Sequence, residues 1–593
     1  MFKITSRWLS VTSLLLLFMG LPFQTVLADQ GDPPARVARL SVIQGKLSFQ
    51  PAGESQWSEV SVNRTVSTGD RLYTDQQSRA ELEVGSFAVR LSETTDLTVA
   101  NLNDQLLQLG LGQGSIRVSV YDLPPNNTVE IDTPNGALTL EQNGSYRVDI
   151  APDGNSTFVT VIAGRLEVTG GDLRQDVGAG RTVQLTGTGP IAVASAARPQ
   201  PDDFDRWCAD RDRRIEQYRS AKYVSRDVPG AEDLDEYGTW RNEPEYGPVW
   251  VPARVAPDWV PYRVGHWAWI EPWGWTWVDD EPWGFVPFHY GRWAHLGPIW
   301  CWVPGPVVVR PVYAPALVAF VGGGGFHIGI GIGIQAWFPL GPREPFVPWY
   351  HYGPTYLHQV NVTNVRNVNI TNINVTNINY ANRGVATTAV SGDAFRGGRS
   401  VSQSMVRVNQ HDLAQARVIP HPDVTPARTA VFGGRNVAAP PVRAASVTRP
   451  EAGARGQAPA ARSYPTAAPS GSRSTPPTSG RFGVPAGNSP TTVARPAPST
   501  AGRFAGPPST PPRAFVTRNP VPQQSVPFTN REPALSSHPG RPLEPQQVQN
   551  LRKGQAAGPM KDREVIPHAE KAEKGSRSAP KAAPREGGGR QKR

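Results

Sequence analysis

A threefold tryptophan repeat constrains the fold of this chain more than any other feature of its sequence. The chain has 17 tryptophans, and 12 of them lie between Trp240 and Trp302. Gly-x-Trp triplets begin at Gly238, Gly265 and Gly291, and their tryptophans precede a Trp-Val pair by 10, 10 and 9 residues. A period of this kind indicates one supersecondary unit used three times, none of which buries its apolar face alone.

Each unit has the composition of a β-hairpin. Two short segments rich in Trp and Val are separated by Gly, Pro and Asp, which favours aromatic strands joined by a turn over a helix. Pro248, Pro272 and Pro298 lie between the paired segments, where a residue without an N–H donor is tolerated at a turn or a strand edge. The repeat therefore predicts three stacked β-hairpins over 237–305.

The region 38–196 predicts a second, all-β unit. Its runs place apolar side chains on one face and polar side chains on the other, and glycine-containing turns separate them at roughly ten-residue spacing. This pattern is typical of a sandwich, a roll or a short solenoid. The runs are ELEV, FAVRL, SIRVSV, TVEI, ALTL, SYRVDI, FVTVI, RLEV and TVQL.

Four longer motifs in the same region carry a family resemblance. They read GDRLYTDQQSRAELEV, FAVRLSETTDLTV, VEIDTPNGALTLEQNGSYRVDI and FVTVIAGRLEV. Together they resemble a FecR-type domain, named for the periplasmic regulator of ferric citrate uptake. The resemblance implies an all-β fold and a place in the cell envelope. It does not carry over the anti-sigma activity of the best-known members, which have an anti-sigma segment and a transmembrane helix.

A connector helix is predicted over 202–223. Asp202 or Asp203 can cap it, and Phe204, Trp207 and Cys208 begin an apolar face at helical spacing. We expect this face to lie on a sheet. The charged run 210–214 is interpreted as a solvated helix face.

The Trp-rich region carries a second resemblance, over about 204–402. The segments GHWAWIEPWGWTWVDDEPWGFVPFHYGRW and AWFPLGPREPFVPWY are similar to an uncharacterised Trp-rich domain that follows FecR-type domains in secreted bacterial proteins. That family implies no activity. Within it, 306–402 is predicted as a β extension with a Gly/Ile-rich run and Asn-rich pentads.

The two ends of the chain have biased compositions. Residues 1–28 read as a secretory signal peptide with cleavage near Ala28, and no later run is long and apolar enough for a transmembrane anchor. The sequence therefore predicts a periplasmic or secreted protein. Residues 403–593 are rich in Pro, Ala, Ser, Gly and Arg, which predicts a disordered tail. We expect that residues 431–593 can be deleted without affecting folding.

The charge of the chain lies mostly in that tail. Residues 431–593 contain 25 Lys and Arg against 8 Asp and Glu, a net +17. Because the whole chain carries +10, the first 430 residues carry −7. The tail is expected to associate with anionic surfaces through charge. It contains no specific nucleic-acid motif.

Two groups of residues are candidates for chemistry. The acids 279–281 stand beside many tryptophans, as in a glycoside hydrolase cleft, but three acids before Pro282 are more typical of a turn. His266, His289 and His295 match no zinc spacing. The sequence therefore predicts no catalytic residue, no metal and no cofactor.

The tryptophans themselves allow two interpretations. Exposed rings would give a glycan platform at Trp267, Trp275, Trp293 and Trp300. Alternatively the rings fill the core of a module poor in aliphatic residues. We favour the core, because large aromatic rings bury the most area per residue.

The two cysteines, Cys208 and Cys301, also leave two alternatives. In an exported protein they can form a disulfide between the connector helix and the third repeat. They can equally be two buried, reduced thiols.

These observations favour a non-enzymatic binding or scaffolding protein of the cell envelope, with an envelope protein or a polysaccharide as its partner. One alternative is a carbohydrate-binding or carbohydrate-active protein that uses the Trp-rich module. Another is an envelope signalling component related to FecR-type regulators.

Overall fold

The computed structural model describes residues 31–307, 311–322, 333–362, 378–409, 411, 413, 416–441, 514–558 and 560. The predicted signal peptide lies outside these residues, as do most of the Gly/Ile-rich run and the Asn-rich pentads. The fold is mainly β, as predicted, and is built from several antiparallel sheets. Among the described residues no helix is both long and apolar enough to cross a membrane.

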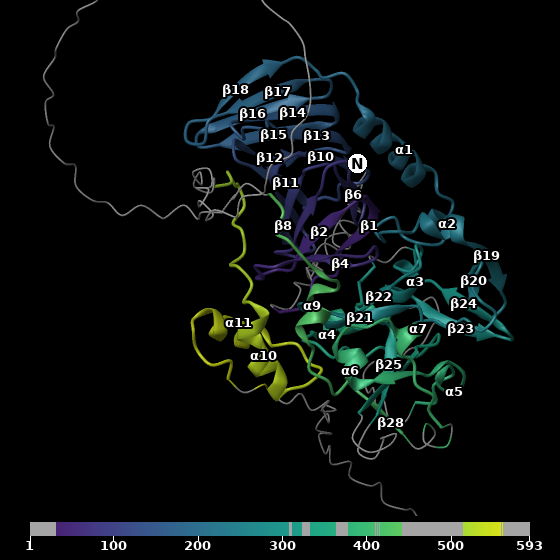
Figure 1. Ribbon diagram of the computed structural model, residues 1–593. Helices are drawn as coiled ribbons and strands as arrows, with labels where there is room; N and C mark the ends of the chain where they lie inside the picture. The colour runs from purple at the N-terminus through teal and green to yellow at the C-terminus, as the bar shows by residue number, and fades with distance from the viewer. Residues whose placement is uncertain are drawn as a thin grey trace, which may run out of the picture.

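The region 38–196 forms two large sheets that share one apolar core (Figure 1). In β13, for example, Tyr146, Val148 and Ile150 point into this core and alternate with polar residues. The nine-stranded sheet has the order β18 (Ala192–Ala196), β17 (Thr182–Thr186), β14 (Ser156–Ala163), β13 (Gly144–Ile150), β10 (Ser115–Val120), β7 (Phe87–Leu91), β6 (Arg79–Val84), β1 (Ala38–Gln44) and β4 (Thr65–Val66). The ten-stranded sheet has the order β16 (Leu173–Gly178), β15 (Arg165–Gly170), β12 (Gly136–Leu140), β11 (Thr128–Thr133), β9 (Leu106–Gln113), β8 (Asp96–Leu102), β5 (Arg71–Thr74), β2 (Leu47–Gln50), β3 (Trp57–Glu59) and β29 (Asn436–Val437).

These two sheets form a β-sandwich that grows along the chain. Strand numbers rise almost steadily along both sheets, because the chain crosses from one sheet to the other after every one or two strands. Of the three architectures that the alternating runs allowed, the structure is a sandwich with the stepwise growth of a short solenoid. We call this unit the sandwich.

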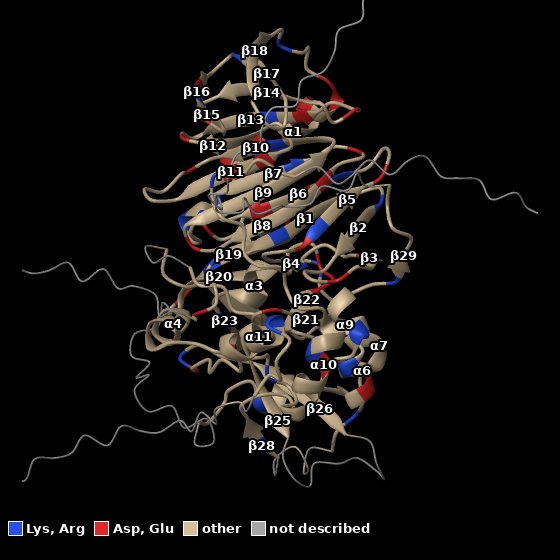
Figure 2. Cartoon of the chain, turned by 90° about the vertical axis from the view of Figure 1, so that its left-hand side faces the viewer, with Lys and Arg blue, Asp and Glu red and all other residues tan. Residues whose placement is uncertain are grey.

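Helix α1 (Asp203–Gln217) lies where the connector helix was predicted and is shorter than expected. Asp202 caps it, since its side chain accepts a hydrogen bond from the backbone N–H of Asp205 at 2.8 Å. Only part of the charged run is a solvated face: Asp210 and Arg213 are exposed and pair with each other, whereas Arg211 bonds Glu81 of the nine-stranded sheet and Asp212 bonds Arg90. The buried part of the run pairs with charged residues on the outer face of that sheet. Figure 2 shows acidic and basic residues interspersed along the sandwich strands.

The Trp repeat forms three β-hairpins, as predicted. They are β19 (Gly238–Glu243) with β20 (Gly247–Pro252), β21 (Gly265–Ile270) with β22 (Gly274–Asp279), and β23 (Arg292–Leu296) with β24 (Ile299–Val303). They do not stack in sequence order. The first and third hairpins join in one four-stranded sheet through β20 and β24, and the second stands alone as a two-stranded sheet.

Cross-strand pairing explains the spacing of the tryptophans. Trp240 lies opposite Trp250, Trp267 opposite Trp277, and Trp293 opposite Trp302. Directly opposed side chains on one face of an antiparallel pair are in contact. The ten-residue spacing is therefore the length of one hairpin measured between its facing aromatic rings.

The predicted β extension is not a separate layer on the repeat. Its strands form a sheet of order β27 (Thr388–Ser391), β26 (Ile334–Pro339), β25 (Val318–Gly322) and β28 (Arg417–Ile419). Trp337 and Phe320 of this sheet share one apolar cluster with the repeat tryptophans. We call the hairpins, this sheet and their short helices the Trp module. The helices are α2 (Asp233–Tyr237), α3 (Val286–His289), α4 (Pro354–Val360), α5 (Arg383–Ala386), α6 (Gly392–Arg396), α7 (Val401–Ser404) and α9 (Arg428–Phe432), with a 3₁₀ turn at Ser220–Lys222.

Two stretches within the predicted disordered tail are folded against the rest of the chain. One ends in β29, which pairs with β3 at the sandwich edge. The other, residues 514–558, contains α10 (Phe528–Ser537) and α11 (Pro545–Arg552) and places Phe528, Leu535 and Leu543 in the core of the Trp module. We call 514–558 the arm and 31–441 the body. The expectation that residues 431–593 are dispensable for folding does not fit these contacts.

Candidate functional site

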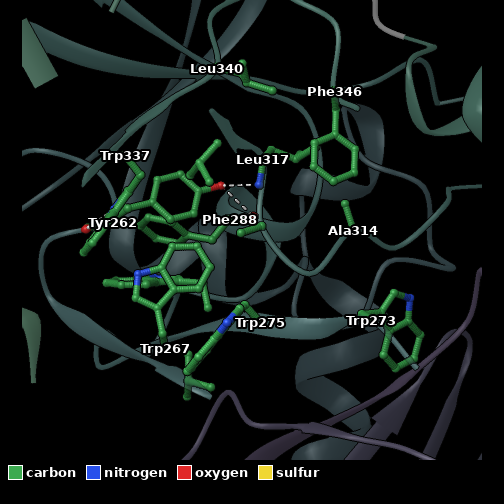
Figure 3. Packing of buried hydrophobic residues seen from close by; sticks show 14 of the residues in the cluster. Tyr262, Trp267, Trp273, Trp275, Phe288, Ala314, Leu317, Trp337, Leu340 and Phe346 are labelled. Carbon is green, nitrogen blue, oxygen red and sulfur yellow. Dashed lines mark hydrogen bonds between the residues drawn. The ribbon is translucent and has the colours of Figure 1, made fainter. Parts of the chain in front are cut away.

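The four tryptophans of the possible glycan platform lie in the core of the Trp module, and Figure 3 shows Trp267 and Trp275 among their neighbours. Trp267 and Trp293 are 1% exposed, Trp275 is fully buried and Trp300 is 7% exposed. A sugar-binding platform needs a ring face open to solvent, and these rings offer none. The platform interpretation is therefore wrong for all four residues, because each ring is packed inside the apolar cluster of the Trp module.

The acids 279–281 form a turn that docks on the sandwich. Asp279 is buried and accepts hydrogen bonds from Trp277 Nε1 at 2.9 Å and from the Glu281 backbone N–H at 3.0 Å. Burial raises the pKa of the Asp279 carboxyl well above its usual range. Asn63 of the sandwich donates to the backbone oxygens of Asp279 and Glu281 at 3.1 and 2.6 Å. The turn interpretation accounts for all of these contacts.

The three histidines do not come together. Burial lowers the pKa of His289 to about 3, and its Nδ1 lies 2.8 Å from the Ala314 oxygen. Burial also lowers the pKa of His266 to about 4, whereas His295 packs on the Trp300 ring. No group of metal-ligating side chains occurs among the residues that the structure describes.

The two cysteines are free and buried in different places, so the disulfide interpretation is wrong for this structure. Cys208 lies on α1 against the nine-stranded sheet, and Cys301 packs with Val249, Val251 and Ala294 beside the first and third hairpins. Their elements are positioned by separate cores, and no packing brings the two thiols together.

We expect two free thiols per chain in denaturant without reductant. The native protein should react slowly at neutral pH, because burial raises the pKa of the Cys208 thiol to about 12 and that of Cys301 to about 11. Thiol titration before and after unfolding checks this. A denatured chain without reactive thiols would contradict the expected reduced state.

The most developed recognition site described in the chain lies on the outer face of the ten-stranded sheet. Gln108, Glu130, Thr139 and Glu167 form one cross-strand row over β9, β11, β12 and β15, since each lies opposite the next. A second row begins with Gly110 opposite Asp132. Residues 515–519 of the arm lie across both rows. We call these five residues the strip, and the two rows the receptor face.

The receptor face binds the backbone of the strip. Glu130 Oε1 accepts hydrogen bonds from the backbone N–H groups of Arg518 at 2.8 Å and Asn519 at 3.1 Å. Gln108 Nε2 donates to the Asn519 backbone oxygen at 2.9 Å. The Val516 N–H donates to the Thr133 oxygen at 3.0 Å. These contacts hold the backbone of the strip, which forms a β-bridge to Thr133 at Val516 and bends at Arg518 and Asn519.

Side chains of the strip add specificity at both ends. The Phe515 ring lies directly over Gly110, where an added Cβ would come within 3.0 Å of the ring. Arg518 forms an ion pair with Glu167 at 2.6 Å and donates to Thr139 Oγ1 at 3.3 Å. The receptor face therefore selects an aromatic side chain and, three residues later, an arginine.

Burial controls the charge of this face. Burial first, and then the neighbouring Glu130, raise the pKa of Asp132 to about 10. Asp132 is therefore uncharged at neutral pH, and it accepts a hydrogen bond from Gln108 Nε2 at 2.8 Å. A neutral carboxyl here avoids two adjacent buried negative charges beneath the strip.

A cleft of about 1100 Å³ lies between the sandwich, the Trp module and residues 522–552 of the arm. Two contacts join the arm to the body around it: Arg531 forms an ion pair with Glu271 at 2.6 Å, and His351 Nδ1 lies 2.8 Å from a carboxylate oxygen of Glu544. Its apolar lining includes Pro33, Val66 and Leu102 from the sandwich, Trp273 and Tyr356 from the Trp module, and Leu543 and Val548 from the arm.

Part of the chain matches a known protein family. Residues 231–344 match a family of unknown function, DUF6600. The match falls inside the range 204–402 of the predicted Trp-rich resemblance. No curated protein matches the chain. The FecR-type resemblance of 38–190 stays a prediction.

Two crystal structures, each of a candidate anti-sigma factor from Parabacteroides distasonis ATCC 8503, are similar to the chain. The first is 12% identical with a TM-score of 0.19, and the match covers 21% of this chain and 59% of that one. The second is 12% identical with a TM-score of 0.15, covering 25% and 60%. The chain thus spans about three fifths of the length of these structures.

Proposed function

We propose that this chain is a non-enzymatic binding and scaffolding protein of the cell envelope, and that its sandwich binds a short peptide segment on the receptor face. The envelope location follows from the predicted signal peptide. The binding function rests on one observation: Glu130 and Gln108 bind the main chain of the strip, while Gly110 and Glu167 select two of its side chains. Main-chain contacts for affinity and side-chain sites for specificity are how domains recognise extended peptides.

The receptor face is also built to be occupied. Gln108 and Glu130 are fully buried with the strip in place, and Asp132 is 1% exposed. Gln108 Nε2 and Glu130 find their partners in the strip, so an occupant that covers this face without offering hydrogen bonds would leave buried polar groups unpaired, at a cost of about 1–3 kcal/mol each. A peptide that supplies the same N–H and C=O groups would satisfy Gln108 Nε2 and Glu130 equally well.

We expect a synthetic peptide, AFVTRNP, to bind a full-length variant whose own strip is weakened by Phe515→Ala, Arg518→Ala and Asn519→Ala. The variant should bind it at least about tenfold more tightly than the natural chain, whose own strip competes at an effective concentration on the order of millimolar. Fluorescence anisotropy with labelled peptide measures both affinities.

A matched pair of glycine substitutions controls this experiment. In the strip-weakened chain, Gly110→Val should abolish peptide binding, because its side chain would occupy the place of the Phe515 ring. Gly178→Val should leave binding unchanged, because an added Cβ there meets nothing within 4 Å. Failure of the strip-weakened chain to bind the peptide, with its melting temperature intact, would reject the receptor face.

A further inference from the structure

The covalent connection between body and arm does not fix which copy of the chain an arm binds. The body ends beyond β29, and the strip lies on β11, six strands away in the sheet order. At the usual strand spacing this is about 30 Å. The 72 residues from 442 to 513 would span about 240 Å if fully extended. The connection is several times longer than the distance it bridges within one copy.

An arm also needs a body to cover its apolar side chains. Phe528 and Leu535 are 1% exposed and Phe515 is 8% exposed only because the arm is docked. Released, these side chains would be in water, at a cost of roughly 25 cal/mol for each Å² of apolar surface. Docking on a second copy restores every one of these contacts. Exchange of an identical element between copies therefore loses no contact.

Charge favours contact between the arm of one copy and the body of another. The arm, residues 514–558, contains five Lys and Arg against two Asp and Glu, a net +3, whereas the body, residues 31–441, carries a net −7. The local contacts have the same polarity, since Arg518 pairs with Glu167 and Arg531 with Glu271 of the body. The opposite charges of arm and body attract each other over about one Debye length, roughly 8 Å at physiological salt.

From these observations we infer that the arm is exchanged between copies of this chain, so that the strip of one copy occupies the receptor face of another. The inference rests on the proposed receptor face and identifies its partner as a second copy. In dilute solution each arm stays on its own body, because a tethered arm has an effective concentration on the order of millimolar. Where copies are crowded, the same contacts link one chain to the next.

Reciprocal charge reversal tests this exchange in the full-length chain. One variant carries Arg518→Glu and Arg531→Glu, which reverses the arm, and the other carries Glu167→Arg and Glu271→Arg, which reverses the body. In each variant alone, the arm and the body carry charges of the same sign at both contacts. Mixed, the reversed arm fits the reversed body and the natural arm fits the natural body. The mixture should form heterodimers in sedimentation velocity, with a dimer fraction at least about tenfold above either variant alone.

The chain with all four substitutions is the matched control, because it restores both pairs within one copy and should sediment as the natural protein does. Near-ultraviolet circular dichroism verifies that the Trp module is folded in every variant. If Arg531 does not tolerate reversal, the half-exposed Arg518–Glu167 pair alone repeats the test. A mixture that stays monomeric at every concentration, while AFVTRNP still binds the strip-weakened chain, would overturn the exchange and leave the peptide-binding function standing.

Discussion

Replacing Trp267 by alanine should lower the free energy of unfolding of the Trp module by about 3–5 kcal/mol, the usual cost of truncating a large buried aromatic side chain. Trp267 is 1% exposed. Its ring lies 5.4 to 5.5 Å from the rings of Trp277, Phe320, Trp337 and Phe395. These rings come from the second hairpin, the neighbouring sheet and α6. Removing the indole therefore leaves a cavity where three elements meet (Figure 3).

Two controls distinguish a core ring from any other role. Trp267→Phe keeps most of the ring contacts and should cost clearly less than the alanine variant. Trp207→Ala removes a half-buried indole on α1, which stacks on Phe204, and should have a smaller effect. Thermal melts followed by far-ultraviolet circular dichroism measure all three. An alanine variant at position 267 that melts within about 1 kcal/mol of the natural protein would show that the ring is not part of the core.

The register within each hairpin could be predicted from the sequence, but the arrangement of the three hairpins could not. Within a hairpin, the spacing between Trp267 and Trp277 is set by the strand length and the turn, both of which are local. The pairing of Trp250 with Trp302 joins the first and third hairpins, skips the second and leaves no local pattern. Sequence periodicity therefore predicted the units but not which hairpins pair with each other.

In the receptor face, too, the local features could be predicted from the sequence and the long-range arrangement could not. The alternation in TVEI, ALTL and RLEV places Glu130, Thr139 and Glu167 on the polar face of their strands, which the structure matches. Their alignment in one row depends on the register between strands far apart in the chain. The occupant was missed because composition was averaged over the whole tail, which hid the short apolar segments around Phe515 and Phe528.

Arg90→Ala should destabilise the sandwich by about 3–5 kcal/mol, the usual cost of breaking a buried ion pair by removing one partner. Arg90 lies in the sheet and belongs to the charged residues that join it to α1. The side chains of Arg90 and Glu81 are fully buried and lie 2.6 Å apart. Arg90 also pairs with Asp212 of α1 at 2.6 Å and donates to Tyr121 at 3.1 Å. Loss of the guanidinium leaves two carboxylates short of a partner between the helix and the sheet.

A surface pair provides the comparison. Arg206→Ala breaks an ion pair with Asp203 on the solvent side of the same helix, where both side chains are mostly exposed. Such pairs contribute about 0–1 kcal/mol. Urea unfolding of the two alanine variants measures the contrast. Equal, small losses for both would show that the buried network does not hold α1 on the sandwich.

The same network predicts how stability depends on acid. Burial alone would raise the pKa of Glu81, but Arg90 and Arg211 outweigh burial and lower it from 4.5 to about 2. Because the folded-state pKa lies below the unfolded one, the contribution of Glu81 is fully present above about pH 4.5. It is lost as the pH falls toward 2, with an uptake of up to about one proton on unfolding.

Glu81→Gln should therefore flatten the fall in unfolding free energy between pH 4.5 and 2, while lowering stability at neutral pH because Arg90 and Arg211 lose their carboxylate. The Arg90→Ala variant should show a shallower acid slope for the same reason, since its Glu81 keeps only Arg211 as a partner. Urea unfolding at a series of pH values tests both. A slope unchanged by either substitution would mean that the charges under α1 are compensated independently, and that shape alone holds the helix on the sheet.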